Sequence, residues 1–242
     1  MNEFIKKYKL WLTVVLAVVL VGGIWMATKD NGSGGSKTSS TFNKEVQTKC
    51  MADVNEELFC KFAGSFAGVG DYKVTVNSTA EGSASVLELA SDSKGNSSMV
   101  VKVNGQEQGN VVVFSGVTYS KDYTDGQWFK YAASDTSKPE ALDLKKEFVK
   151  GDFKADNGQK IDYVKAGTEK CGSLNCYKYQ IKDPTKPTEE GFLWFDTKDY
   201  LMRRVTIKDS NNNADMTLSY SAVSISAPSP TKDVPSDSSL DQ

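Results

Sequence analysis

Apolar and polar side chains alternate along residues 191–228, and the rest of the predicted fold is arranged around this stretch. Within residues 201–208, Val205 and Ile207 alternate with arginine, threonine and lysine, the period-two pattern of a half-buried strand. An aromatic-rich run precedes this segment, and another alternating run follows the turn-forming residues 209–213. The pattern predicts three consecutive antiparallel strands.

The same alternation recurs upstream, between residues 72 and 131. Short apolar runs are separated there by turn formers, among them Asn104-Gly105 and Asp125-Gly126, which are typical of hairpins. Two further runs lie at 161–166 and 177–182. Together these runs predict about ten or eleven strands, and their connection by turns favours one large curved antiparallel sheet, a half-barrel, over a two-layer sandwich.

Two segments have the three-to-four-residue spacing of amphipathic helices. The first is 42–66, and the second begins at residues 137–140, where a capping-box spacing includes a proline in the first turn. We therefore expect an α+β domain with helices on the concave face of the sheet. Phe62 and Phe66 belong either to ordinary helix–sheet packing, the simpler interpretation, or to a lid over an apolar cavity.

The segment Leu10–Ala27 is uncharged and apolar and follows three lysines in residues 1–9. About 27 Å of helix would span most of the ~30 Å hydrocarbon layer. A cleaved signal peptide and a retained anchor are both open, but Trp25 fits poorly at the −3 position of a cleavage site after Ala27. A retained anchor would place residues 1–9 in the cytoplasm and the remaining chain outside.

Two polar segments flank the predicted domain. Residues 28–41 are rich in glycine and serine, as in a flexible tether, and residues 229–242 lack apolar periodicity, as in a disordered tail. The sequence thus predicts a folded, monomeric, extracytoplasmic domain spanning 42–228. A single N-terminal transmembrane helix would hold it at the cell membrane.

The charge and residue types exclude several classes of function. The 242-residue chain has a formal net charge of −2 and no histidine. The lack of basic excess argues against nucleic acid, and the lack of histidine removes the commonest general base and metal ligand. No nucleophile elbow, phosphate-binding loop or metal-ligand spacing is found. We therefore expect no enzymatic activity, no cofactor and no metal.

Four cysteines lie in the part predicted to be extracytoplasmic, where disulfides persist. We predict local pairs, Cys50 with Cys60 and Cys171 with Cys176, because each pair brackets a short segment. On a continuous helix Cys50 and Cys60 would lie about 15 Å apart, beyond the ~4.4–6.8 Å Cα separation of a disulfide. The helix is therefore expected to break near Asn55. A four-thiolate zinc site is disfavoured because neither pair has a CxxC spacing.

Alternation also selects candidate inward-facing side chains, for which ordinary core packing is the simpler interpretation. The candidates for contact with an apolar ligand are Phe62, Phe66, Leu87, Leu89, Met99, Val101, Val103, Val111, Val113, Trp128, Trp194, Met216 and Leu218. The sequence does not tell which sheet face is concave. Trp128 and Trp194 could instead lie on the outer face with their N–H groups in water.

The order of elements resembles the LolA-like and LppX-like lipoprotein-carrier superfamily, the outer-membrane lipoprotein-sorting type of fold. The resemblance spans 42–228 and is carried by a V-x-Y … G-x-W-x-K strand pair and a closing W-x-D-x-x-x-x-L … R meander that ends near a proline. The matching residues are Val117, Tyr119, Gly126, Trp128, Lys130, Trp194, Asp196, Leu201, Arg204 and Pro228.

The resemblance implies an unclosed half-barrel with a hydrophobic cavity under helical lids, which receives the acyl chains of lipoproteins or glycolipids. Burial of such a chain gains about 0.8 kcal/mol per CH₂ group and needs no catalytic residue. A tethered chain cannot shuttle between membranes, so we expect a protein that binds lipid or acylated protein at one membrane. The alternative is a ligand-free protein-interaction or envelope-sensor module on the same fold.

Overall fold

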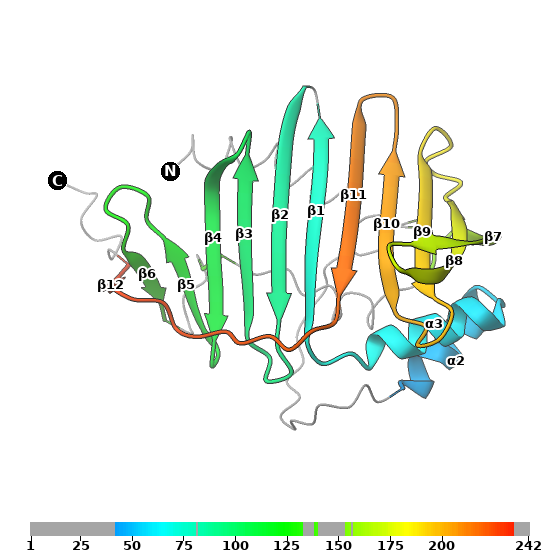
Figure 1. Cartoon of the computed structure of the whole chain (residues 1–242), viewed down its shortest axis with the longest axis horizontal. Coiled ribbons are helices and arrows are strands. Elements are labelled where there is room, and N and C mark those ends of the chain that lie inside the picture. Colours follow the sequence, from blue (N-terminus) through cyan, green and yellow to red (C-terminus); the bar gives the residue numbers. More distant parts are fainter. Residues whose placement is uncertain (1–41, 81, 133–137, 140–152, 156, 235–242) are drawn as a thin grey trace.

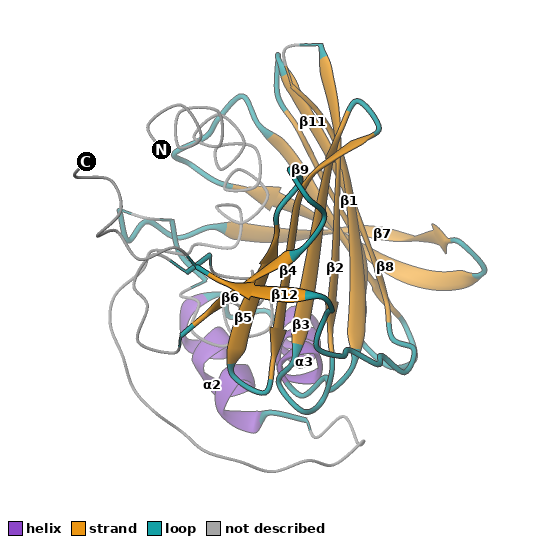
Figure 2. Cartoon of the chain, turned by 90° about the vertical axis from the view of Figure 1, so that its left-hand side faces the viewer, coloured by secondary structure: helices purple, strands orange, loops and turns teal. Residues whose placement is uncertain are grey.

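The computed structural model describes residues 42–80, 82–132, 138–139, 153–155 and 157–234. They form two helices and one twisted sheet of twelve strands (Figures 1 and 2). The helices are α2 (Lys44–Asp53) and α3 (Glu57–Ala67). The strands are β1 (Tyr72–Ala80), β2 (Ser83–Ser91), β3 (Ser97–Val103), β4 (Gln106–Phe114), β5 (Val117–Lys121), β6 (Trp128–Tyr131), β7 (Asp162–Cys171), β8 (Leu174–Lys182), β9 (Glu190–Asp196), β10 (Met202–Lys208), β11 (Asn212–Ser219) and β12 (Thr231–Asp233).

Two series of strands that are consecutive in the chain meet at β1 and β11. The strand order is β12-β6-β5-β4-β3-β2-β1-β11-β10-β9-β8-β7, and every pair is antiparallel except β12 with β6. The sheet is open, because β7 and β12 form separate edges. The predicted large antiparallel sheet is confirmed, with twelve strands instead of ten or eleven.

The C-terminal limit of the domain lies beyond the predicted one. After β11 the chain runs along the lower ends of β1 to β5 (Figure 1), and Thr231–Asp233 then pairs with β6 as β12. The prediction of a disordered tail from residue 229 is therefore wrong for residues 229–234. Polar composition concealed this strand, because a three-residue edge strand can pair through its backbone without an apolar side.

The N-terminal helical segment breaks where the cysteine spacing predicted. α2 ends before Asn55, whose φ of 57° lies in the left-handed region. The break brings the Cα atoms of Cys50 and Cys60 to 5.3 Å, and the two residues form a disulfide. Cys171 and Cys176 form a second disulfide at the β7–β8 hairpin, with Cα atoms 5.8 Å apart. Both predicted pairings are confirmed.

Other predictions fall outside the described residues. They concern the cytoplasmic segment 1–9, the transmembrane span 10–27, the linker 28–41 and the body of the second helix, 140–151. In the part of the chain that is described, no helix has both the length and the apolar character needed to cross a membrane.

Candidate functional site

The strand register lines up apolar side chains on one face of β1–β4. Val74 lies opposite Leu89, Leu89 opposite Met99, and Met99 opposite Val111. Side chains of one face recur every second residue of a strand, so these rows define a surface that we term the aliphatic face. Its residues are Val74, Val76, Leu87, Leu89, Met99, Val101, Val103, Val111 and Val113.

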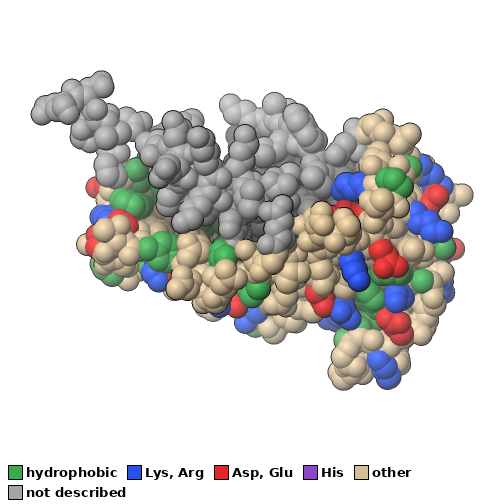
Figure 3. Space-filling view, turned by 90° about the horizontal axis from the view of Figure 1, so that it is seen from above, with side chains coloured by type: hydrophobic (Ala, Val, Ile, Leu, Met, Phe, Trp, Pro, Cys, Tyr) green, Lys and Arg blue, Asp and Glu red, His purple; other side chains and the backbone are tan. Residues whose placement is uncertain are grey.

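The opposite face of β1–β6 carries the charges of these strands. The register places on that face Lys73, Glu88, Lys102, Glu107, Lys121 and Lys130. Two ion pairs form there, Lys102 with Glu88 at 3.0 Å and Lys121 with Glu107 at 3.2 Å. Figure 3 shows charged side chains along its lower margin, which is the front of Figure 1. The aliphatic face therefore has no charged side chain on β1–β6, in contrast to its reverse.

A different set of side chains covers the same face at β7–β10. From α3, Phe59, Phe62 and Phe66 are at most 1% exposed. Phe62 stacks on Phe195 of β9 with ring centroids 4.6 Å apart, and Phe59 stacks on Tyr163 of β7 at 4.1 Å. We term this group the aromatic core, and its residues are Phe59, Phe62, Phe66, Tyr72, Tyr163, Tyr179 and Phe195. Phe62 and Phe66 thus pack as core, the simpler of the two interpretations.

Glu56 joins α3 to the sheet. Its carboxylate caps the helix by accepting the Phe59 N–H, and it also accepts the Tyr179 hydroxyl at 3.0 Å. Tyr179 is fully buried, and burial together with the Glu56 carboxylate raises the pKa of its hydroxyl. The hydroxyl therefore remains a donor at physiological pH. The Cys50–Cys60 disulfide links α2 to α3, so the Glu56–Tyr179 bond connects the helical pair to the sheet.

The remaining strand residues predicted for the site divide by exposure. Most are buried, whereas Met99, Val103 and Val113 are half-buried. The buried ones are Leu87, Leu89, Val101, Val111, Met216 and Leu218. Since Leu218 lies opposite Val74 in the β1–β11 pair, the aliphatic face continues into β11. The structure therefore brings these residues together on one surface.

Trp194 lies on the other side of the sheet. Leu193 and Phe195 in β9 point toward the helices, so the residue between them points away. Its indole N–H donates to Glu169 at 2.5 Å, and Arg204 lies 5.2 Å from the ring centroid. The prediction that Trp194 faces inward is wrong, and its N–H is bonded to a carboxylate instead of water. The sequence could not show which residues of β9 face the helices, because apolar side chains occur on both faces of this strand.

Trp128 also points away from the aliphatic face. Its neighbour Phe129 lies opposite Ser120 of β5 in the strand register, and Ser120 lies opposite Val111 of β4. Phe129 therefore shares the aliphatic face, and Trp128 lies on the reverse. The prediction that Trp128 faces inward is wrong as well. In a four-residue strand of large side chains, the sequence does not show which residues face inward.

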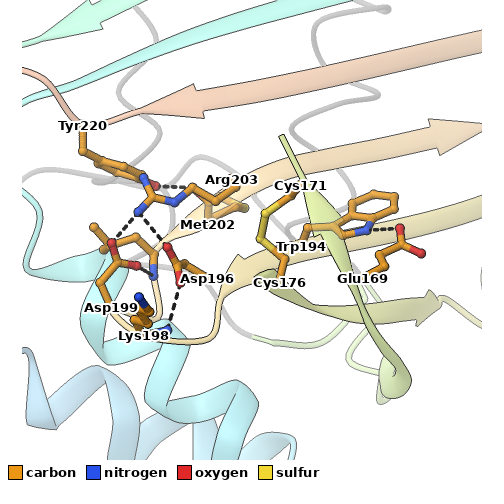
Figure 4. Close-up of a disulfide and its surroundings, with 11 residues drawn as sticks. Glu169, Cys171, Cys176, Trp194, Asp196, Lys198, Asp199, Met202, Arg203 and Tyr220 are labelled. Carbon is orange, nitrogen blue, oxygen red and sulfur yellow. Dashed lines mark hydrogen bonds and ion pairs between the residues drawn. A yellow bond between two sulfur atoms is a disulfide. The ribbon is translucent and has the colours of Figure 1, made fainter. Parts of the chain in front are cut away.

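Sequence reasoning also missed the role of Arg203. A β-bulge in β10 follows Met202 and turns Arg203 toward Asp196, to which it donates at 3.4 Å, while the guanidinium lies 4.9 Å from the Tyr220 ring (Figure 4). Arg204, the residue matched by the family resemblance, instead pairs with Asp215 on the outer face at 2.7 and 2.9 Å. No sequence signal marked the bulge.

The side chains of the aliphatic face suit contact with apolar groups. Within the described ranges, no group of His, Cys, Asp or Glu is placed to hold a metal ion. All four cysteines are in disulfides. An uncharged aliphatic surface can bury hydrocarbon, and its lining residues supply no acid, base or nucleophile.

No protein-family model and no curated protein matches this sequence. Among solved structures, the chain is similar to the lipoprotein LppX of Mycobacterium tuberculosis, with 13% identity, coverage of 76% of this chain and 99% of that chain, and a TM-score of 0.44. It is also similar to LprF from Mycobacterium bovis, with 15% identity, coverage of 78% and 98%, and a TM-score of 0.46.

A LolA superfamily protein from Nitrosomonas europaea is a further similar structure, with 9% identity, coverage of 74% of this chain and 92% of that chain, and a TM-score of 0.24. At these identities, and with TM-scores below 0.5, the likeness carries no conclusion about fold family, ligand or partner.

Proposed function

We propose that this chain is a membrane-anchored extracytoplasmic protein that binds the acyl chains of lipids or lipoproteins in a hydrophobic cavity of a half-barrel. The observation that carries the proposal is the aliphatic face, which is continuous from β11 to β4 and uncharged on β1–β6. Met99, Val103 and Val113 keep part of their surface exposed there, so apolar area remains for a ligand to bury.

The side chains of this surface suit a hydrocarbon chain. Valine, leucine and methionine line most of it from β2 to β4, beside Ser85 and Ser97 and without an aromatic ring. Transfer of each CH₂ group from water to an apolar surface gains about 0.8 kcal/mol. A headgroup would stay outside, because a charge buried against this face would have no partner.

The anchor sets where the lipid would be held. The predicted span 10–27 and tether 28–41 lead to Phe42, which precedes α2. A domain attached in this way would hold or present a lipid at the surface of one membrane and would not carry it across a compartment.

Matched variants of the full chain test this proposal. The detergent-purified protein would be examined by native mass spectrometry and by lipid analysis of its organic extract. Met99 and Val100 are adjacent, half-buried and on opposite faces of β3. Met99→Lys should remove a stoichiometric bound lipid, and Val100→Lys should retain it, because its new charge would lie beside Glu88.

The same measurements contain the opposing outcome. A wild-type chain that stays lipid-free when lipids are offered would overturn the proposal, as would equal loss of lipid in both variants. A lipid-free chain would favour the protein-interaction or envelope-sensor module.

A further inference from the structure

The outer edge of β6 is filled by the C-terminal strand of the same chain. β12 is the one parallel strand in the described sheet. Residues 220–230 lead to it from β11 without a helix or strand. The Pro230 carbonyl accepts the Trp128 N–H at 3.0 Å where the pairing begins. The last strand is thus joined to the domain through a long irregular connection.

Lys232 makes the side-chain contacts that hold β12. Its Nζ lies 2.5 Å from Asp122 Oδ2 and 2.8 Å from Asp125 Oδ2, both in the β5–β6 turn. The same ammonium lies 4.4 Å from the ring centroid of Phe129, within the range of a cation–π interaction. Two carboxylates and one aromatic ring therefore converge on a single cation.

Few other contacts fasten β12. It has three residues, its Thr231 and Asp233 are exposed, and parallel pairing is slightly weaker per residue than antiparallel pairing. The Lys232 ion pairs are partly exposed, so water and salt weaken them. If β12 leaves, the β6 edge presents unpaired backbone groups beside Asp122 and Asp125, and such an edge is a template for another strand.

We propose that the β6 edge and the turn 122–127 form a strand-acceptor site for an extended segment of a partner protein that carries lysine or arginine. β12 occupies this site in cis and is displaced by the partner. Backbone pairing supplies affinity in such strand addition, and side-chain pockets supply specificity. The specificity element here is the cation position opposite Phe129, where a basic side chain reaches Asp122 and Asp125 and an acidic one is repelled.

The test uses the full chain and a fluorescent peptide with the sequence of residues 228–234. Lys232→Glu should release β12 by repulsion from the two aspartates, and amide exchange of Trp128–Tyr131 should become faster. This variant should bind the peptide at least tenfold more tightly than the wild type does, and the peptide should slow the exchange again. A peptide with glutamate in place of its lysine should not bind.

Further variants separate the site from nonspecific attachment. Asp122→Asn with Asp125→Asn, added to Lys232→Glu, should abolish peptide binding and leave the thermal unfolding midpoint unchanged. Failure of the peptide to bind a Lys232→Glu chain whose β6 amides exchange fast would overturn the proposal. So would unchanged β6 exchange in that variant. Dimers of the wild type that dissociate on Lys232→Glu would also overturn it, because a second copy would then be the partner.

Discussion

The aromatic core and the aliphatic face lie on the same side of one sheet, and they are built differently. In the aromatic core, rings from α3 stack on rings from β7 and β9, and the Glu56–Tyr179 bond holds the helix in place. The aliphatic face consists of valine, leucine and methionine, with Met99, Val103 and Val113 only half-buried. Dense ring packing buries the side chains at one end of the sheet, whereas part of the apolar surface stays exposed at the other end.

The largest expected difference between the two regions is in the cost of truncation. Phe62 is fully buried and stacked on Phe195, so Phe62→Ala should lower the free energy of unfolding by about 3–5 kcal/mol. Met99→Ala should cost only about 1 kcal/mol, because a half-buried side chain loses less contact. Chemical denaturation followed by circular dichroism measures both. Equal costs would contradict the division of the sheet into a densely packed end and a partly exposed end.

Removal of a disulfide is expected to have the next largest effect on the free energy of unfolding. Cys50 and Cys60 are fully buried between α2 and α3, and replacing both with alanine should cost about 2–3 kcal/mol by freeing the unfolded chain. Replacing Cys171 and Cys176, which close a shorter loop, should cost about 2 kcal/mol. The first pair fixes the helices of the aromatic core, so its loss should also speed amide exchange in α3. Unchanged exchange would indicate that ring packing alone holds the helix.

Substitution of Gly64 by alanine is expected to change stability less, and the direction of the change is informative. A Cβ added there would lie 2.8 Å from the Phe42 ring and 2.9 Å from the Asn43 backbone oxygen. Alanine favours a helix over glycine by about 1 kcal/mol, but the backbone oxygen cannot rotate away, and overpacking costs about 1–3 kcal/mol. We expect Gly64→Ala to be net destabilising, by about 1 kcal/mol in denaturant titration, and Ser65→Ala to be neutral. A stabilised Gly64→Ala chain would show that residues 42–43 move aside easily.

Sequence reasoning succeeded where a physical pattern had one solution. Alternation fixed the sheet and most of its inward residues, and the distance between two cysteines on a helix fixed the break near Asn55. It failed where the local pattern was consistent with two structures. The phase of Trp194 could not be read from an apolar run, and the bulge that turns Arg203 toward Asp196 depends on the paired strand. Tertiary pairing settled both.

The β12 strand was missed for the same reason. Its three residues are polar and follow a proline-rich segment, so neither hydrophobic periodicity nor strand propensity marks it. Its place depends on the free edge of β6 and on Asp122 and Asp125, about a hundred residues earlier in the chain. A strand whose position depends on a sheet edge and an ion pair can be predicted only once the rest of the sheet is known.

The smallest effect is expected at this edge, where partly exposed charges hold β12, in contrast to the buried rings that hold α3 in the aromatic core. Hydrogen bonding to Lys232, followed by the Thr124 backbone N–H, lowers the pKa of Asp122 from 3.8 to about 2. A carboxyl group whose pKa is lowered in the folded state stabilises that state above its unfolded pKa, and the contribution is lost as the pH falls toward 2. The attachment of β12 should therefore persist at pH 4 and weaken near pH 2.

The carboxyl ¹³C shift of Asp122, titrated in the full chain, measures this pKa directly. Lys232→Ala should raise the midpoint toward 3.8, and Lys232→Arg should keep it low, because arginine preserves the cation. The global unfolding midpoint should hardly change in either variant, since the pair is partly exposed and lies at the edge of the sheet. A low midpoint in Lys232→Ala would mean that the Thr124 N–H sets the pKa, and that β12 is held by its backbone alone. The β6 edge would then be held by backbone hydrogen bonds, like the other strand pairs of the sheet. It would be weaker than the aromatic core only because it has few paired residues.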